Sequence, residues 1–579
     1  MLKTLGAQIK EYKRDSLLTP VFMILEVILE TIIPFMMASI IDDGVEAGDM
    51  KHICIMGVCM LLTAAASLWA GVMGGKYGAS ASTGFAKNLR KAMYANIQTF
   101  SFSNIDKFST SGLVTRLTTD VTNIQNSYQM VLRMCMRAPA TLICAMAMSF
   151  YVNPKIATIY LAAVILLTVI NVFITKSAMK YFSAVFKKYD KLNESVQENV
   201  SAIRVVKAYS REDFEKSKFA KASENIYKMF VKAEGLVVIN MPIMQGIAYT
   251  CILLISWLGA KMIVGGSMTT GELSQLLTYC MNILMSLMFL SMIFVMLTMS
   301  IASAERIAEV LNEKADIVNP ENPVMEVKDG SILFENVEFR YNMTSPEPVL
   351  KGINISINQG ETIGIIGGTG SAKSSLVNLI SRLYDVSSGS VKVGGVDVRE
   401  YDIETLRNEV AVVLQKNVLF SGTIYDNLRW GNKDATEEEC RHACKLACAD
   451  EFIDRMTDGY NTYIEQGGSN VSGGQKQRLC IARALIKKPK ILILDDSTSA
   501  VDTATDSKIR KAFAEEIPGT TKIIIAQRIS SIQNCDRIIV MEDGCVDGFG
   551  THEELLASNE IYREVYESQV SGNADFDEN

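Results

Sequence analysis

The sequence predicts an α-helical membrane domain with six transmembrane helices, fused to a second domain of α/β type. Residues 1 to about 310 are apolar, rich in Met and poor in Pro, with stretches long enough to cross a bilayer. Residues from about 330 onward alternate short β-type runs with helical stretches and glycine turns. Hydrophobic residues make up 49% of the 579-residue chain, which fits a large membrane part.

The two parts meet at a polar stretch that contains prolines, "LNEKADIVNPENPVMEVKDG". We therefore place the membrane domain at residues 1–318, a linker at 319–329, the second domain at 330–570 and a flexible tail at 571–579. The net charge of −7 argues against binding to nucleic acid. The cysteines lack the spacing of a disulfide framework, so we expect reduced thiols that face cytosol or lipid.

Six apolar stretches in the first part are candidate membrane spans. They are roughly residues 16–41, 53–76, 128–152, 155–177, 236–264 and 273–300. Three connections are short, whereas the other two are about 50 and 60 residues long and rich in Lys and Arg. The positive-inside rule then places the long loops and both termini in the cytoplasm. The N-terminus does not read as a removable signal peptide, so the first span is expected to direct insertion into the plasma membrane.

The long loops still have a helical pattern, so spans two to five are expected to continue as helices into the cytosol. Two amphipathic pieces are expected at the turning points, "STSGLVTRLTTDVTNIQN" (109–126) and "RVVKAYSREDFEKSKF" (204–219).

Charged and sulfur-containing side chains inside the spans leave alternatives open. Glu26 and Glu30 lie one turn apart and either pair structurally or contact a cationic substrate. Arg133 and Arg137 open the third span and are expected at the cytoplasmic interface. A methionine stripe in the sixth span either packs against helices and lipid or lines an adaptable cavity. Its members are Met281, Met285, Met288, Met292, Met296 and Met299.

A phosphate-binding loop is predicted in "ETIGIIGGTGSAKSSLVNLI". The pattern G-x-x-x-x-G-K-[ST] spans Gly367 to Ser374, with Ala372 at the last glycine position. Backbone N–H groups at a helix N-terminus would bind phosphate, Lys373 would reach the β- and γ-phosphates, and Ser374 would ligate Mg²⁺. Ala372 closes the loop without strain at negative φ, but costs about 1 kcal/mol at positive φ. The phosphate-binding set is Gly367, Gly370, Ser371, Ala372, Lys373, Ser374 and Ser375.

Two further motifs point to a dimer. In "ILILDDSTSA" an apolar strand ends at Asp495, which would hold Mg²⁺ through water. In "NVSGGQKQRLCIARAL" two glycines follow Ser472 at the start of a helix, which makes a second phosphate-binding helix N-terminus. One nucleotide does not need two such sites on the same domain. We therefore expect ATP to be sandwiched between two nucleotide-binding domains.

The order of these motifs resembles the ATP-binding cassette (ABC) exporters over nearly the whole chain, as a half-transporter with one α/β P-loop nucleotide-binding domain. The resemblance implies that Tyr341 stacks on adenine, and that Gln415 senses Mg²⁺ and the coupling helices. Glu465–Gly468 would contact the coupling helices, which would be the two turning-point pieces. The signature motif would be Ser472, Gly473, Gly474 and Gln475, the D-loop would run from Ser499 to Asp502, and the Mg²⁺ set would be Ser374, Gln415 and Asp495.

Two positions depart from the family pattern. Asp496 stands where the family has a catalytic Glu, and Gln527 stands where it has a switch His. Asp withdraws the carboxylate by about 1.5 Å, and misplacement on this scale can cost about 10²-fold in rate. Gln can donate one hydrogen bond to a γ-phosphate, but it cannot become cationic.

The pair Asp496 and Gln527 resembles the degenerate-site subunit of bacterial heterodimeric multidrug-type exporters. That resemblance implies a second half-transporter that supplies the catalytic Glu and switch His, while this chain's intact signature completes the partner's site. A homodimer with slow hydrolysis, a membrane protein that only binds ATP, and an importer subunit remain alternatives. The cargo is expected to be hydrophobic or amphipathic, with drug, lipid and peptide left open, and membrane lipid surrounds the spans.

Cys440, Cys444 and Cys448 recur every four residues in "CRHACKLACAD". Three thiolates along one helix cannot converge into a tetrahedral metal site, so we expect them to pack as small apolar residues.

Overall fold

The computed structural model describes residues 1–342, 345–497 and 501–574. The chain forms two compact units. Unit 1 comprises Met1–Gln98 and Ser109–Glu313, and unit 2 comprises Thr99–Phe108 and the chain from Lys314 onward. Of the expected tail, residues 571–574 end a helix, and residues 575–579 lie outside the described part.

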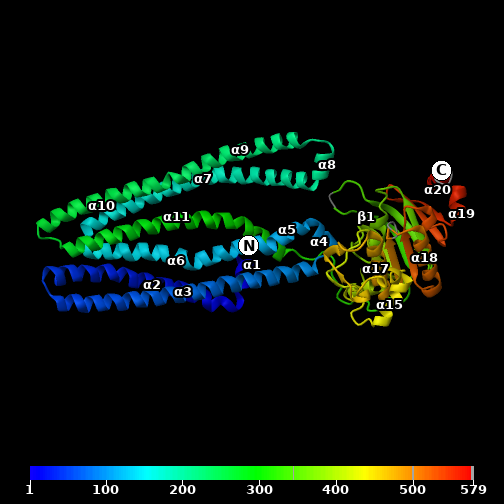
Figure 1. Cartoon of the computed structure of the whole chain (residues 1–579), viewed down its shortest axis with the longest axis horizontal. Coiled ribbons are helices and arrows are strands. Elements are labelled where there is room, and N and C mark those ends of the chain that lie inside the picture. Colours follow the sequence, from blue (N-terminus) through cyan, green and yellow to red (C-terminus); the bar gives the residue numbers. More distant parts are fainter. Residues whose placement is uncertain (343–344, 498–500, 575–579) are drawn as a thin grey trace. The chain divides into compact units, whose positions relative to one another are not determined.

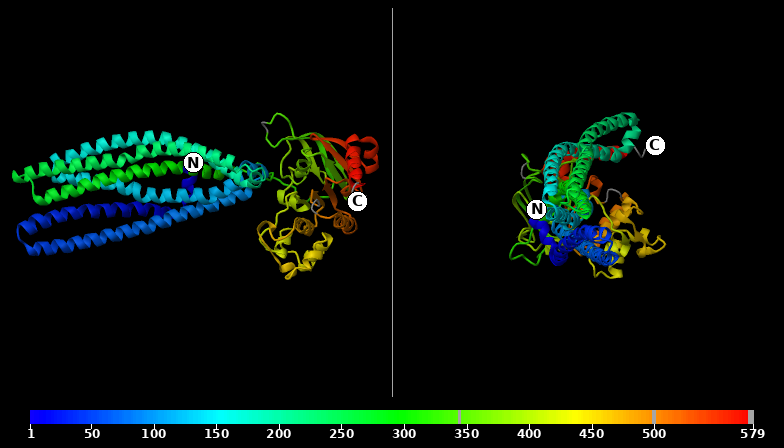
Figure 2. Two further views of the ribbon diagram at one scale, coloured as in Figure 1. Left: turned by 45° about the horizontal axis from the view of Figure 1, so that its top comes forward. Right: turned by 90° about the vertical axis from the view of Figure 1, so that its left-hand side faces the viewer.

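Unit 1 is entirely helical in its described residues (Figure 1). Its elements are α1 (Leu2–Gly6), the 3₁₀ turn η1 (Ala7–Tyr12), α2 (Lys13–Ser39), the π-helical turn η2 (Ile40–Glu46), α3 (Met50–Thr99), α5 (Thr110–Thr115), the π-helical turn η3 (Arg116–Asp120), α6 (Val121–Val152), α7 (Pro154–Ser201), α8 (Ile203–Ala208), α9 (Glu212–Val238), α10 (Asn240–Val264) and α11 (Thr270–Asn312). The long helices of this unit run side by side in the views of Figures 1 and 2.

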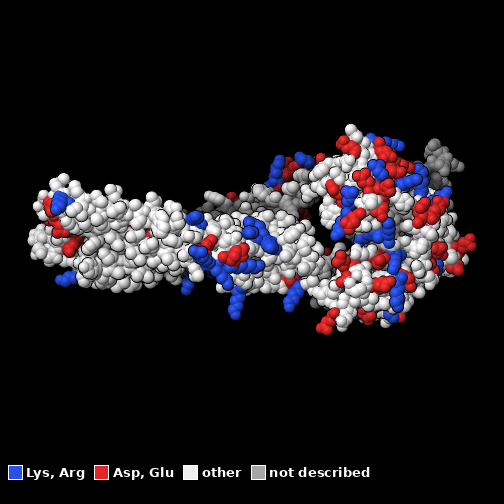
Figure 3. All heavy atoms as spheres, turned by 90° about the horizontal axis from the view of Figure 1, so that it is seen from below, with Lys and Arg blue, Asp and Glu red and all other residues white. Residues whose placement is uncertain are grey.

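Six helical stretches of the described chain are long and apolar enough to cross a membrane, which confirms the expected number. They are Leu2–Glu46, Met50–Thr99, Thr110–Val152, Pro154–Phe182, Glu212–Val264 and Thr270–Leu290. On the face of unit 1 drawn in Figure 3, charged side chains gather at the two ends of a long stretch that is nearly bare of charge. This distribution fits a lipid-embedded part flanked by water.

Two buried tyrosines of the membrane helices donate hydrogen bonds to backbone oxygens of neighbouring helices. Tyr160 of α7 donates to the backbone oxygen of Leu276 at 2.8 Å. Tyr279 of α11 donates to the backbone oxygen of Thr31 at 2.8 Å. Both tyrosines are almost fully buried. Because hydrocarbon offers no competing partners, such bonds tie α11 to α7 and to α2.

The segment between the second and third spans is divided between the two units. The expected turning-point piece 109–126 belongs to unit 1 as α5, η3 and the start of α6. The preceding segment, Thr99–Phe108, instead forms part of unit 2 and contains α4 (Phe102–Lys107). Between α7 and α9 lies α8, which begins one residue before the second expected turning-point piece, 204–219.

Unit 2 contains α4, three sheets and the following elements. The strands are β1 (Ile332–Phe339), β2 (Leu350–Ile357), β3 (Thr362–Gly367), β4 (Ser388–Val393), β5 (Val396–Asp397), β6 (Val410–Val413), β7 (Gly422–Thr423), β8 (Tyr463–Ile464), β9 (Ile491–Asp495), β10 (Thr521–Ile525), β11 (Arg537–Glu542) and β12 (Cys545–Gly550). The helices are α12 (Lys373–Ile380), α13 (Ile403–Glu409), α14 (Ile424–Leu428), α15 (Glu437–Leu446), α16 (Asp450–Ile453), α17 (Gly473–Ile486), α18 (Thr503–Glu516), α19 (His552–Ser558) and α20 (Glu560–Ala574), with 3₁₀ turns η4 (Gly459–Asn461), η5 (Gln466–Gly468) and η6 (Ile529–Ser531).

The central sheet of unit 2 has the order β12-β11-β3-β10-β9-β6. Its strands pair in parallel except for β12, which is antiparallel to β11. A second, antiparallel sheet has the order β2-β1-β4-β5, and β7 pairs with β8. Strands β9 and β10 are buried at every position, as expected for central strands with both faces covered.

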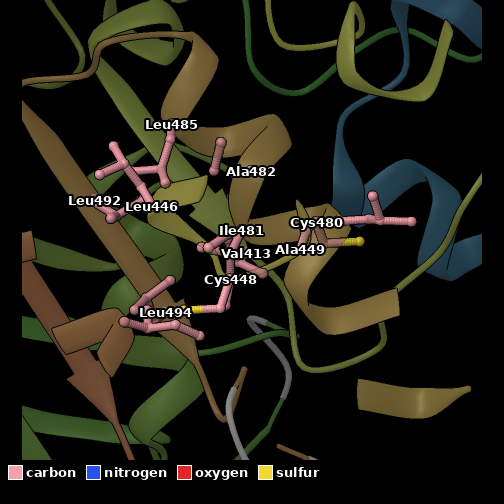
Figure 4. Close-up of a cluster of buried hydrophobic side chains, with 14 of the residues drawn as sticks. Val413, Leu446, Cys448, Ala449, Cys480, Ile481, Ala482, Leu485, Leu492 and Leu494 are labelled. Atoms are coloured by element: carbon pink, nitrogen blue, oxygen red, sulfur yellow. The ribbon is translucent and has the colours of Figure 1, made fainter. Parts of the chain in front are cut away.

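One core cluster of unit 2 contains the three regularly spaced cysteines. Cys440 and Cys444 are fully buried, and Cys448 is 8% exposed. Cys448 belongs to the same core as Ile481 and Leu494 (Figure 4). The three thiols therefore pack as small apolar side chains. Burial also raises the pKa of the Cys448 thiol, which favours its uncharged form.

Candidate functional site

Three neighbouring parallel strands deliver the predicted site residues to one edge of the central sheet. In the order β3-β10-β9, Ile525 pairs with both Ile365 and Asp495. The phosphate-binding loop follows β3, Asp495 ends β9, and Gln527 lies two residues beyond β10. The carboxyl ends of parallel strands are where open α/β sheets bind ligands. The topology therefore brings together residues that are far apart in the sequence.

The phosphate-binding loop is held in shape by its own lysine. Lys373 Nζ donates to the backbone oxygens of Gly367 and Gly368, at 2.9 and 2.8 Å, and to Ser371 Oγ at 3.1 Å. A Cβ on Gly367 would lie 2.2 Å from the backbone oxygen of Met541, so only glycine fits there. Burial lowers the pKa of Lys373, against the opposing effect of Asp495 and Asp496.

Ala372 adopts the conformation that costs energy. Its φ of 70° and ψ of 22° are left-handed, and it is the residue that precedes α12. A left-handed alanine costs roughly 1–2 kcal/mol relative to a right-handed one, because its Cβ approaches the following carbonyl oxygen. Of the two alternatives that the sequence left open, the strained one applies.

Asp495 and Ser374 form a pair of oxygen ligands suited to a divalent cation. The Ser374 side chain lies near enough to the Asp495 carboxylate to act on its pKa. Asp495 is 5% exposed, and its pKa is raised, first by burial and then by the neighbouring Asp496, while the Ser374 side chain acts in the opposite direction. A buried carboxylate beside a hydroxyl fits the oxygen preference of Mg²⁺. A bound Mg²⁺ would supply charge neutralisation for phosphate oxygens at this position.

The two residues that depart from the family pattern contact each other. Gln527 Nε2 donates to Asp496 Oδ2 at 2.9 Å. Asp496 has a φ of 48°, a left-handed conformation in which Asp is favoured over longer residues. The carboxylate that would receive a proton from water is thus engaged by the side chain at the switch position.

The backbone around Gln527 is held by a residue that the sequence reasoning did not find. Gln569 of α20 donates from Nε2 to the Gln527 backbone oxygen at 2.9 Å. Its Oε1 accepts from the Ile529 backbone N–H at 2.8 Å. No local motif marks Gln569, which lies 42 residues beyond Gln527 in the sequence.

Tyr341, the predicted adenine-stacking residue, is half exposed beside the phosphate-binding helix. Its hydroxyl lies 2.8 Å from Ser375 Oγ. Its ring meets the Tyr384 ring edge-on at 5.1 Å between centroids. Tyr384 in turn donates to Asp106 Oδ2 of α4 at 2.6 Å. A chain of contacts within unit 2 therefore runs from α12 to the segment Thr99–Phe108.

The signature residues form the exposed start of α17. Ser472 caps this helix, and Gln475 completes a reciprocal capping box, with Ser472 N donating to Gln475 Oε1 at 2.9 Å. Ser472 and Gly473 are exposed, so the first N–H groups of α17 face away from the core. A free helix N-terminus of this kind can bind an anion from another molecule.

The remaining predicted residues lie in their expected elements. Gln415 is exposed and follows β6, the strand next to β9. Asp502 caps α18 by accepting from the Thr505 backbone N–H at 2.9 Å. Ser499 of the predicted D-loop lies outside the described residues. In the loop before the signature, Glu465 accepts from the Ser469 hydroxyl at 2.7 Å.

A cavity of about 430 Å³ with a mostly apolar wall lies among α2, α6 and α11 of unit 1. Arg137, which we expected at the membrane interface, instead pairs with both intramembrane carboxylates. Its Nη1 lies 2.9 Å from Glu26 Oε1 and its Nη2 lies 2.9 Å from Glu30 Oε1. The wall consists of Val27, Glu30, Thr31, Met134, Arg137, Ala138, Thr141, Asn282, Met285, Ser286 and Phe289.

The methionine stripe of α11 is divided among several surroundings. Met285 lines the cavity, and Met288 packs against the core of the membrane helices. Met281, Met292 and Met296 are exposed, and the Met299 side chain lies outside the described set.

The fold and the site define a membrane-embedded P-loop protein of the ABC type. The ABC transporter transmembrane region matches residues 17–303, and the ABC transporter domain matches residues 350–499. The chain is 37% identical to "Uncharacterized ABC transporter ATP-binding protein YfiB" of Bacillus subtilis (strain 168), over 97% of both chains. It is 32% identical to an "ATP-dependent lipid A-core flippase" of Desulfotalea psychrophila, over 83% of this chain and 84% of that protein.

The solved structure of a bacterial Atm1-family ABC exporter with ATP bound has the same fold. The TM-score is 0.83 at 23% identity, and the match covers 96% of this chain and 99% of that one. The chain belongs to the ABC transporter family and is a half-transporter of the exporter type, with one transmembrane domain and one nucleotide-binding domain.

Proposed function

We propose that this chain is one subunit of a heterodimeric ATP-driven exporter, and that its own nucleotide site binds Mg-ATP but hydrolyses it slowly. The contact between Gln527 and Asp496 carries this proposal. A general base must accept a proton from the attacking water, and the donor to Asp496 is a side-chain amide that cannot take the proton onward. The shorter Asp carboxylate adds a misplacement to this loss.

The same chain is proposed to support fast hydrolysis at the other site. Ser472 and Gly474, at the free N-terminus of α17, would contact a nucleotide held by a partner half-transporter, which carries the catalytic Glu and the switch His. Closure of the two nucleotide domains would then be transmitted through the coupling helices to the membrane helices. The nucleotide-binding domain and both termini would lie in the cytoplasm of a bacterium, with the spans in the plasma membrane.

The proposed cargo is hydrophobic or amphipathic. The cavity among α2, α6 and α11 supports this, because it combines the paired charges of Arg137 and Glu30 with Met134, Met285 and Phe289. Relatives named as lipid A-core flippases at 32% identity favour a lipid among the candidate cargoes.

ATPase assays test the subunit asymmetry. The chain alone, the chain with a half-transporter that has Glu and His at the two positions, and the mixture with that partner's Glu changed to Gln would be compared. We expect turnover only in the intact mixture. In that mixture Ser472→Arg should abolish hydrolysis because it blocks the partner's site, whereas Asp496→Asn should leave most of it. Full turnover by this chain alone would favour a homodimer and would overturn the proposal.

A further inference from the structure

The C-terminal helix α20 hydrogen-bonds to the loop after β10 through the side chain of Gln569. Gln569 makes two hydrogen bonds to the loop after β10, one to the backbone oxygen of Gln527 and one from the backbone N–H of Ile529. A carboxamide can satisfy a carbonyl oxygen and an N–H group at once, since it carries both a donor and an acceptor. Gln569 therefore holds the backbone on both sides of Arg528, because it bonds to the residue before it and to the residue after it.

The helix that carries Gln569 is itself firmly attached. Tyr562, one turn into α20, is fully buried, and its hydroxyl lies 2.7 Å from His552 Nδ1. Its backbone N–H donates to Asn559 Oδ1 at 2.8 Å, and Asn559 donates to Asp547 Oδ2 at 2.7 Å. Gln569 lies seven residues after Tyr562, on the same face of the helix. The position of Gln569 is thus set by the packing of α20.

Later in the loop after β10, Ser530 and Ser531 hydrogen-bond to side chains of α18. Arg510 Nη1 donates to the Ser530 backbone oxygen at 2.9 Å, and the Ser531 hydroxyl donates to Asp506 Oδ2 at 3.1 Å. Arg510 and Asp506 form an ion pair at 2.9 Å. These contacts do not reach Gln527, whose side chain is exposed. Gln569 is therefore the described side chain that holds the backbone of Gln527 itself.

We propose that Gln569 is a positioning residue, which orients Gln527 toward the γ-phosphate position and toward Asp496, and thereby couples α20 to nucleotide affinity at this chain's own site. The inference rests on the nucleotide site described above and extends the proposed function to its regulation. Loosening of the 527–529 backbone would release the Gln527–Asp496 contact. Movement of α20 would then change ATP affinity without touching the nucleotide.

Gln569→Glu separates positioning from simple packing. The ionised carboxylate still accepts from Ile529 N–H, but it has no donor for the Gln527 oxygen and repels it. The protonated carboxyl group regains a donor. ATP affinity of this variant, relative to wild type at the same pH, should therefore fall roughly five- to tenfold at pH 8, as expected for one lost and one opposed hydrogen bond, and recover about halfway near pH 4.3, where an ordinary Glu is half protonated. The charged neighbours on this path, Arg528 and Asp496, are unchanged in every variant compared.

The measurement uses the full-length complex in detergent. Photolabelling with 8-azido-ATP at 4 °C, displaced by a non-hydrolysable ATP analogue, reports the occupancy of this chain after electrophoresis. Gln569→Ala should lose affinity at every pH, and Ser568→Glu places the same charge one residue away on an exposed position and should behave as wild type.

Three results would overturn the inference. These are wild-type affinity in Gln569→Glu at pH 8, a loss in Gln569→Glu that is the same at both pH values, or an equal loss in Ser568→Glu. Rapid hydrolysis at this site would overturn the proposed function instead, and the pH profile of affinity would still decide the role of Gln569.

Discussion

Gln527 and Asp496 form a hydrogen bond of 2.9 Å between the two positions that the sequence predicts to depart from the family pattern. Because the two side chains bond to each other, a change at one position alters the surroundings of the other. We expect the double change Asp496→Glu with Gln527→His to raise hydrolysis at this chain's own site by about 10²-fold, because it restores both the reach of the base and a side chain that can become cationic.

The assay for this change uses a partner whose catalytic Glu is replaced by Gln, so that only this chain's site contributes. Each single change is expected to give much less than the pair. Asp496→Glu alone should also cost stability, since its left-handed φ of 48° favours Asp over Glu. Turnover that stays at background in the double variant would mean that other residues silence the site.

Ala372→Gly is expected to leave stability unchanged or raise it by up to about 1 kcal/mol. The change relieves the left-handed strain at φ 70°, and the greater freedom of Gly in the unfolded chain offsets part of the gain. Ala482→Gly, within α17, should instead lower stability by about 1 kcal/mol or more. Thermal unfolding of the full chain with and without ATP compares the two. A clear loss in Ala372→Gly would contradict the strain at this position.

Tyr384→Phe removes a hydroxyl that ties Thr99–Phe108 to the rest of unit 2. The bond to Asp106 Oδ2 is 2.6 Å long, and the accepting carboxylate is exposed, so its loss should cost about 1 kcal/mol. The phenyl ring keeps the edge-on contact with Tyr341, so ATP affinity should change less than about twofold. We expect faster hydrogen exchange in α4, measured by mass spectrometry.

Tyr463→Phe, at an exposed tyrosine of the same unit, is the control for Tyr384→Phe. Unchanged exchange in α4 after Tyr384→Phe would show that the other contacts of α4 suffice. These include Asn104 Nδ2 to the Lys314 backbone oxygen at 3.0 Å and Ser103 Oγ to Asp316 Oδ2 at 2.8 Å.

Arg137→Met should destabilise unit 1 by roughly 2 kcal/mol or more. It leaves Glu26 and Glu30 without the cation that they share, and the largely buried Glu26 is then an uncompensated charge. The triple change Glu26→Gln, Glu30→Gln and Arg137→Met should recover most of that loss. Lys228→Met, which breaks the exposed pair of Lys228 and Glu224, should have little effect. Folded yield and thermal unfolding in detergent measure all three. A neutral Arg137→Met would contradict a stabilising role for this pair.

Much of the fold could be predicted from the sequence, because bilayer thickness and strand burial leave strong local signals. Six spans follow from apolar length, and the buried β9 follows from an apolar run that ends at Asp495. The amphipathic pattern predicts a helical piece at 109–126, but local pattern alone does not show that Thr99–Phe108 belongs to unit 2.

The site was predictable only where a motif fixes it. The phosphate-binding loop and signature have defined spacings, but the φ of Ala372 depends on how the loop closes. Arg137 looked interfacial because the sequence does not reveal that α2 and α6 bring it against Glu26 and Glu30. Gln569 was missed because its partners are backbone atoms of a distant loop, which leave no pattern in the residue types.

The uninterrupted length of α3 has a mechanical consequence. Its 50 residues contain no proline, and at 1.5 Å per residue they make a rod of about 75 Å, against a hydrocarbon core of about 30 Å. A tilt of about 10° along such a rod displaces one end by about 13 Å relative to the other. A stiff arm of this length can convert a small rotation at one end of α3 into a large sideways displacement at its other end.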